Sequence, residues 1–185
     1  MISFLTLLGG FLKNIYQCLR FTWTFSVAIT TGPRIVFCRL QQTNLSEKYS
    51  SFRCVIKLNY YLNLTEILSL LTLSLVSSSD IFILHAAAFS IFILTSLISM
   101  TLVTYYIKDV RNQEFKRNIV TISWCCVFLA AYFYNRHNEY CEPFIYSGFA
   151  VCEYLVVGCN MAWHGRVVSQ FTGYRLTAEP HMDLR

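Results

Sequence analysis

Long apolar stretches separated by short polar segments dominate this chain. Five stretches are candidate membrane spans, because a hydrocarbon core of about 30 Å needs about 20 apolar residues of helix. They are residues 21–38, 58–76, 81–107, 119–134 and 144–163. Lipid offers no hydrogen-bond partner to the backbone, so each stretch is expected to be helical. The pattern predicts an all-α, polytopic transmembrane helix bundle with about five spans.

The two ends of the chain fit this pattern less well. Residues 1–20 start with an apolar run that is too short to span comfortably, and the basic start of a signal peptide is missing. The first span contains Gly32 and Pro33, and the proline is expected to kink the helix. Residues 165–185 are predicted to form a tail outside the membrane.

The charges between the spans predict the orientation of the bundle, because cytoplasmic loops are enriched in lysine and arginine. The segments 39–57 and 108–117 are net basic, whereas 77–80 and 135–143 are not. We therefore expect the two basic segments and the C-terminal tail on the cytoplasmic side, and the other two segments in a lumen. The glycosylation sequon at Asn44 then faces the cytoplasm and is predicted to be unused.

Composition excludes several classes of function. Only 14% of the residues are charged, compared with about 25% in an average soluble domain. The net charge of +5 is dispersed along the chain, so nucleic acid is not an expected partner. The eight cysteines lack the spacing of metal ligands. Neither a metal nor a cofactor is therefore predicted.

Polar residues inside the spans are the first candidates for a site, because a charged side chain there costs about 2.5–3.5 kcal/mol to insert. Two stripes follow from helical spacing, one in the second span and one in the fifth. They consist of Asn59, Asn63 and Glu66, and of Glu153, Asn160 and His164. We expect the stripes to face each other, with Glu66 and Glu153 as an acid/base pair near the midplane. Hydrogen bonding between helices, without any chemistry, is the alternative.

The polar segment 136–143, which reads RHNEYCEP, supplies further candidates. It is predicted to form a short loop at the luminal surface. His137 in this loop and His85 in the third span are the histidines expected on that side, and an imidazole suits proton transfer. Asn138 is a candidate for binding substrate. Cys141 is either an acyl-accepting nucleophile or a structural cysteine.

Several of these segments resemble the post-GPI attachment to proteins factor 2 family. Residues 58–66, 76–79 and His85 are similar to the middle of its members. The runs RHNEYCE at 136–142, EYLVV at 153–157 and NMAWH at 160–164 are similar to its C-terminal signature. The resemblance covers roughly residues 20–173, and membrane proteins of the DRAM type are more distant relatives. Members have six helices, so the chain looks shortened at its N-terminus.

The resemblance implies a role in remodelling GPI-anchor lipids in the Golgi membrane, with the endoplasmic reticulum as a second location. There an unsaturated sn-2 chain is replaced by a saturated one, and the resemblance implies a part in the reacylation of lyso-GPI. It implies GPI-anchored proteins, lyso-GPI and membrane lipids as partners, but it supplies no active-site residue. A non-catalytic lipid-binding scaffold, an accessory subunit of an acyltransferase and a small transporter are alternatives. The catalytic candidates are His137, Glu153 and Glu66, and the substrate-binding candidates are His85, Asn138, Asn63, Asn160 and His164.

Overall fold

The structure is a computed structural model of the chain, and it describes residues 2–77, 81–107, 112–140, 142 and 144–169. These residues form five α-helices and no strand. The helices are α1 (Ile2–Lys48), α2 (Arg53–Leu75), α3 (Phe82–Thr101), α4 (Gln113–Tyr140) and α5 (Ile145–Ser169). A 3₁₀ turn, Ser50–Phe52, joins α1 to α2, and a π-helical turn, Leu102–Ile107, extends α3. The predicted all-α membrane bundle is confirmed.

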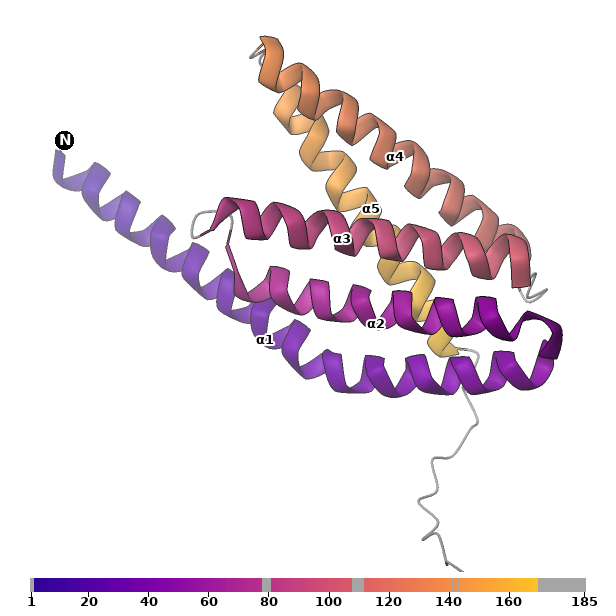
Figure 1. Cartoon of the computed structure of the whole chain (residues 1–185). Helices are drawn as coiled ribbons and strands as arrows, with labels where there is room; N and C mark the ends of the chain where they lie inside the picture. The colour runs from indigo at the N-terminus through magenta and orange to yellow at the C-terminus, as the bar shows by residue number, and fades with distance from the viewer. Residues whose placement is uncertain (1, 78–80, 108–111, 141, 143, 170–185) are drawn as a thin grey trace, which may run out of the picture.

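Three helices in the described part of the chain are long and apolar enough to cross a membrane. They are Phe82–Ile107, Gln113–Tyr140 and Ile145–Arg166. The predicted span 21–38 lies inside α1, and the predicted span 58–76 lies inside α2 except for Val76, which follows the last helical residue. Helix α2 runs between α1 and α3 in Figure 1. The total of five spans remains a prediction.

Helix α1 is longer than the span predicted from hydropathy, because it includes all of residues 2–48. The first part of the chain, which hydropathy left unplaced, is therefore helical from Ile2 onward. Pro33 lies inside this helix without ending it. A proline lacks the backbone N–H that would bond to the preceding turn, so a bend is expected. Figure 1 shows that α1 changes direction along its length.

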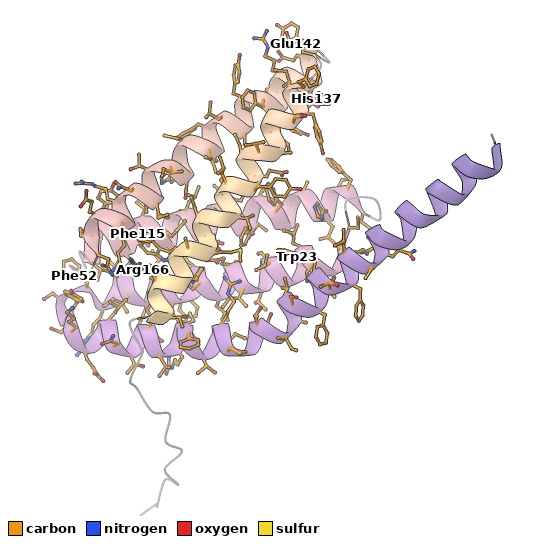
Figure 2. The ribbon with its side chains drawn as sticks, turned by 180° about the vertical axis from the view of Figure 1, so that it is seen from behind. Trp23, Phe52, Phe115, His137, Glu142 and Arg166 are labelled. Carbon is orange, nitrogen blue, oxygen red and sulfur yellow. The ribbon has the colours of Figure 1, made fainter. Side chains whose placement is uncertain are left out.

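The helices pack as neighbours in chain order. Helix α1 packs on α2, α2 pairs with α3, and α4 pairs with α5. The α4–α5 hairpin crosses the other three helices at an angle, so it lies close to them at one end and away from them at the other (Figure 1). Phe115 and Arg166 lie at the close end, whereas His137 and Glu142 lie at the distant end (Figure 2).

The main apolar core lies toward the close end of the bundle. It contains residues from all five helices and from the π-helical turn: Leu45, Ile56, Leu97, Met100, Val103, Ile107, Val120 and Trp163. A smaller cluster joins α4 to α5 through Cys126, Cys152 and Val156. Apolar packing among the five helices is therefore concentrated at this end.

The connection between α4 and α5 is shorter than the loop predicted at 136–143. Helix α4 continues to Tyr140, so the first residues of that segment are helical. Hydropathy marks where lipid ends, but a helix continues into water as long as its backbone bonds are made. It stops shortly before Pro143, which cannot donate a backbone hydrogen bond. Phe144 then has a φ of 67°, in the left-handed region, where α5 begins.

Candidate functional site

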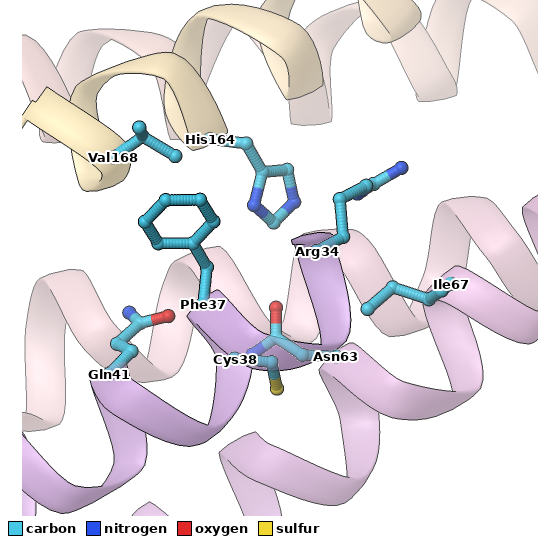
Figure 3. Close-up of a pocket in the computed structure, with 8 residues that line it drawn as sticks. All are labelled: Arg34, Phe37, Cys38, Gln41, Asn63, Ile67, His164 and Val168. Carbon is cyan, nitrogen blue, oxygen red and sulfur yellow. The ribbon is translucent and has the colours of Figure 1, made fainter. Parts of the chain in front are cut away.

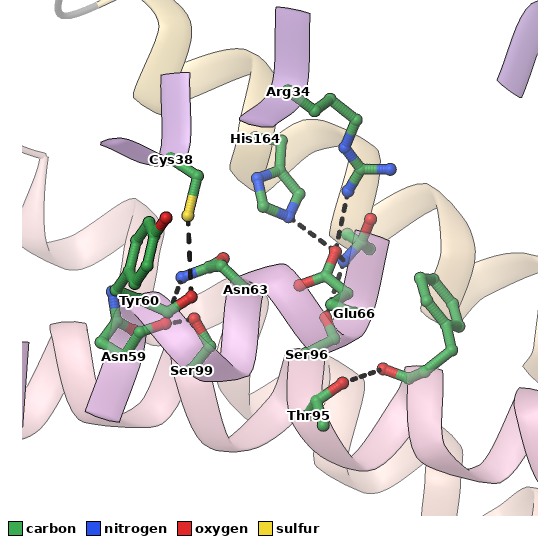
Figure 4. Close-up of polar contacts among 12 residues, drawn as sticks. Arg34, Cys38, Asn59, Tyr60, Asn63, Glu66, Thr95, Ser96, Ser99 and His164 are labelled. Atoms are coloured by element: carbon green, nitrogen blue, oxygen red, sulfur yellow. Dashed lines mark hydrogen bonds and ion pairs between the residues drawn. The ribbon is translucent and has the colours of Figure 1, made fainter. Parts of the chain in front are cut away.

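The carboxylate of Glu66 lies at the centre of a polar cluster inside the bundle, and only 1% of the residue is exposed. Its Oε1 atom accepts hydrogen bonds from Arg34 Nη2 at 2.8 Å and from Asn160 Nδ2 at 3.0 Å. The same oxygen lies 2.9 Å from His164 Nε2. Figure 4 shows Arg34 and His164 converging on Glu66. One carboxylate on α2 therefore joins α1 and α5.

The cluster continues to α3 through two further contacts. Asn160 Nδ2 also donates to Ser96 Oγ at 2.6 Å, so both hydrogens of its amide are used. One turn away, Ser99 Oγ donates to Asn59 Oδ1 at 2.8 Å. Asn63 Nδ2 donates to the backbone oxygen of Asn59 at 2.8 Å. The polar stripe of α2 is therefore hydrogen-bonded to helices on both sides.

The contact between Glu66 and His164 fixes the hydrogen on the imidazole ring. A carboxylate paired with Arg34 has no hydrogen to give, so Nε2 of His164 donates to it. In a neutral imidazole the other nitrogen, Nδ1, then keeps its lone pair. That nitrogen has no hydrogen-bond partner among the residues that the structure describes. The pair is therefore a base oriented by a carboxylate.

A cavity of about 40 Å³ lies beside this pair, between α1, α2 and α5. At roughly 10–15 Å³ per water molecule, it has room for about three waters. Its lining, drawn in Figure 3, consists of Arg34, Phe37, Cys38, Gln41, Asn63, Ile67, His164 and Val168. Arg34 and His164 thus belong to both the cluster and the cavity, and their side chains are 23% and 27% exposed. A ligand in the cavity would meet the imidazole directly.

Glu153, the third residue of the stripe on α5, is not among the partners of Glu66. Asn160 lies about two helical turns, or about 10 Å, further along α5. Because α5 crosses α2 at an angle, the structure brings Asn160 and His164 to Glu66 but leaves Glu153 elsewhere. Glu153 instead interacts electrostatically with His85 of α3. The structure therefore does not bring together the two carboxylates expected to form an acid/base pair.

His85 forms a second oriented imidazole, at the start of α3. Its Nδ1 lies 2.7 Å from the backbone oxygen of Val76. A carbonyl oxygen only accepts hydrogen bonds, so Nδ1 carries a hydrogen, and in a neutral ring Nε2 then keeps its lone pair. Among the described residues no hydrogen bond joins this ring to Glu153, so the Val76 carbonyl alone orients it.

His137 lies far from Glu66. Its ring centroid is 5.4 Å from that of Tyr146. Tyr146 precedes His164 by roughly 18 residues, or about 27 Å along α5. The Nδ1 atom of His137 is buried without a hydrogen-bond partner in the described part of the chain. Asn138 is exposed next to it, and Cys141 lies outside the described residues.

The α4–α5 turn is closed by an ion pair. Arg136 donates from Nε and Nη2 to the two oxygens of Glu142, at 2.9 and 2.8 Å. Its Nη1 donates to the Tyr132 hydroxyl at 3.0 Å. The hydrogen bonds from Arg136 lower the pKa of the Glu142 carboxyl below its usual range. Much of this polar segment therefore closes the turn.

Arg34 is the main site residue that the sequence analysis did not select. The sequence signal was present, since an arginine inside an apolar stretch needs an acidic partner. Ser96 and Ser99 gave no such signal, because serines are ordinary residues in membrane helices. Among the described residues, no group of three or more His, Cys, Asp or Glu side chains could hold a metal ion.

Comparison with known proteins gives a consistent family. The model of the Frag1/DRAM/Sfk1/Cwh43P N-terminal domain matches residues 16–173. Post-GPI attachment to proteins factor 2 of Caenorhabditis elegans is 33% identical over 177 residues, which cover 86% of this chain and 67% of that protein. The protein of the same name in Drosophila melanogaster is 29% identical, with 80% and 63% covered.

A third relative is Acyltransferase PGAP2 of Danio rerio, which is 29% identical over 66% of this chain and 59% of its own length. No solved structure matches the chain. The matched region contains Arg34, Glu66, Asn160 and His164. The chain therefore belongs to the Frag1/DRAM/Sfk1/Cwh43P family, and within it to the post-GPI attachment to proteins factor 2 group.

Proposed function

We propose that this protein remodels the lipid part of GPI anchors in the Golgi membrane. The observation that carries the proposal is the match, over most of the chain, to relatives named post-GPI attachment to proteins factor 2 and Acyltransferase PGAP2. A helical bundle with ionisable groups in its interior suits a substrate that itself lies in the membrane. The partners are then GPI-anchored proteins and their lyso-lipid intermediates.

The proposed reaction is the reacylation of lyso-GPI with a saturated chain. The free sn-2 hydroxyl attacks the carbonyl carbon of an acyl donor, and the hydroxyl proton passes to Nδ1 of His164. The leaving group of the donor departs with that proton. Glu66 stabilises the positive imidazolium through the contact at Nε2. Arg34 and Asn160 hold Glu66 in place, which makes them positioning residues.

His85, with Glu153, is the second candidate for the base. The predicted orientation of the chain in the membrane favours this candidate. Helix α5 is predicted to enter the membrane from the lumen near residue 144, so His164 lies toward the cytoplasmic side. His85 lies near the luminal end of α3, where the head group of a GPI anchor resides. We favour His164 because it contacts its carboxylate directly and lines a cavity. A non-catalytic lipid-binding scaffold, in which both clusters only join helices, is the alternative function.

The test is mass spectrometry of GPI-anchor lipids from cells that lack the protein, with variants added back. The wild-type chain is expected to restore saturated sn-2 chains, and anchors that stay unsaturated with it would overturn the proposed function. His164→Gln at normal protein abundance is expected to leave unsaturated or lyso anchors. Ser90→Ala, on an exposed position of α3, is the control and is expected to behave as wild type.

The same experiment distinguishes His164 from His85 as the base, and both from a non-catalytic scaffold. Normal remodelling by His164→Gln, together with failure of His85→Gln, would move the base to His85. Normal remodelling by both variants would favour the scaffold. Microscopy of the tagged chain tests the location, since absence from the Golgi membrane would contradict the proposed site of action.

A further inference from the structure

The cavity beside His164 is lined by both polar and apolar side chains, which lie next to one another around it. Its polar lining comes from Arg34, Gln41, Asn63 and His164, and its apolar lining from Phe37, Ile67 and Val168. Figure 3 shows the ring of Phe37 close to Val168, and His164 between them and Arg34. A cavity lined by both polar and apolar side chains suits an amphiphile better than water or a free ion.

Arg34 has binding capacity that the protein does not use. A guanidinium carries five N–H donors, and one hydrogen bond, from Nη2 to Glu66, accounts for the interactions of Arg34 among the described residues. Its side chain remains 23% exposed next to the cavity. A membrane-embedded cation with unused donors needs an acceptor, and guanidinium groups favour the oxygens of phosphate and carboxylate. The unused donors therefore indicate an oxyanion as the polar part of the ligand.

The seam between α1 and α5 gives this ligand a way in from the side. These two helices are not a packed pair, whereas α1 packs on α2 and α5 on α4. The contacts of Arg34 and His164 with Glu66 bridge them. Val168 on α5 lines the cavity and is itself an exposed apolar residue, so the cavity has an apolar edge that faces outward. An acyl chain could lie against this edge while its head group enters the cavity.

We propose that this cavity binds the oxyanion head group, phosphate or carboxylate, of a single-chain membrane lipid that enters sideways between α1 and α5. The small volume accepts only the head group or an adjacent ester, so the chain stays outside in the lipid. Glu66 would repel the anion, but Arg34 already neutralises that carboxylate. The role of this lipid in acyl transfer rests on the proposed function, whereas its binding does not.

The experiment is native mass spectrometry of the purified full chain in a neutral detergent. The probes are lysophosphatidic acid and palmitate as anionic amphiphiles, lysophosphatidylcholine as a zwitterionic one, and inorganic phosphate. We expect saturable binding of one anionic amphiphile per chain, at least tenfold tighter than that of the zwitterionic one. Inorganic phosphate should not compete at millimolar concentration, because it lacks the chain.

Two variants and a matched control test the location. Arg34→Gln with Glu66→Gln removes both charges of the ion pair together, so that no carboxylate is left unpaired, and should weaken anionic-lipid binding at least tenfold. Val168→Trp should do the same by filling the mouth of the cavity, and it decides the outcome if the double variant does not fold. Arg39→Gln removes an exposed arginine from the same helix and should bind as wild type.

Three results would overturn the inference: equal binding by the folded cavity variants, equal affinity for the zwitterionic lipid, or equal competition by inorganic phosphate. No turnover is involved, so the result is independent of the proposed reaction. If the chain binds the anionic lipid but cells that lack it have normal anchor lipids, the binding site stands and the remodelling role is wrong. If the chain does not bind the lipid but those cells have defective anchor lipids, the remodelling role stands and the binding site is wrong.

Discussion

Removing Arg34, the cationic partner of Glu66, should destabilise the bundle far more than removing Arg34 and Glu66 together. In Arg34→Leu, a carboxylate that is 1% exposed keeps its charge and loses its ion pair. Breaking a buried pair in this way typically costs about 3–5 kcal/mol. We place Arg34→Leu near the lower limit, at about 3 kcal/mol, because Arg34 is 23% exposed and because Asn160 and His164 still donate to Glu66. That corresponds to about a hundredfold change in the unfolding equilibrium.

The double variant Arg34→Leu with Glu66→Leu should recover most of this loss. It places two apolar side chains in a membrane-embedded position and removes two groups that are each costly to insert. The expected coupling between the two sites in a double-mutant cycle is about 2–3 kcal/mol. Four buried free cysteines provide the assay, because a thiol-reactive dye in detergent labels them only on unfolding: Cys38, Cys126, Cys152 and Cys159. A coupling below about 0.5 kcal/mol would refute the view that Glu66 depends on Arg34.

Three further predictions concern other parts of the chain. Because Arg136 lowers the pKa of Glu142, their contact stabilises the α4–α5 turn at pH values above the usual pKa of a carboxyl group, and this stabilisation is lost as the pH falls through the lowered pKa. Protection of the amides at the end of α4 from hydrogen exchange should therefore decrease at that low pH. Arg136→Gln should remove this pH dependence of protection. Gly148→Ala should weaken α4–α5 packing, since a Cβ would lie 3.1 Å from the Phe133 ring, whereas Gly158→Ala meets nothing within 4 Å and should be neutral or stabilising by up to about 1 kcal/mol; equal thermal stability of the two would contradict this packing. Asn44 should carry no glycan, so a mobility shift on glycosidase treatment would contradict the predicted orientation.

The sequence predicts the elements of this structure better than their contacts. Each apolar stretch lies largely within a helix, because lipid forces apolar segments to satisfy their own backbone, although α1 and α4 extend beyond the predicted stretches. Helical spacing placed Asn160 and His164 on one face, and that face does meet Glu66. Spacing along one helix could not show that Glu153 diverges from Glu66, because this depends on the crossing angle of α5. The contact with Arg34 depends likewise on how α1 packs against α2, and no pattern within one helix specifies it.

The order in which the chain is synthesised gives the Glu66 cluster a consequence for biogenesis. Arg34 emerges before Glu66, but Asn160 and His164 follow 94 and 98 residues later. A nascent bundle therefore holds the carboxylate paired with Arg34 but without its two donors from α5 until that helix arrives. Chains interrupted before residue 160 should be retained by intramembrane chaperones and degraded, which makes this one side chain a checkpoint for completed synthesis.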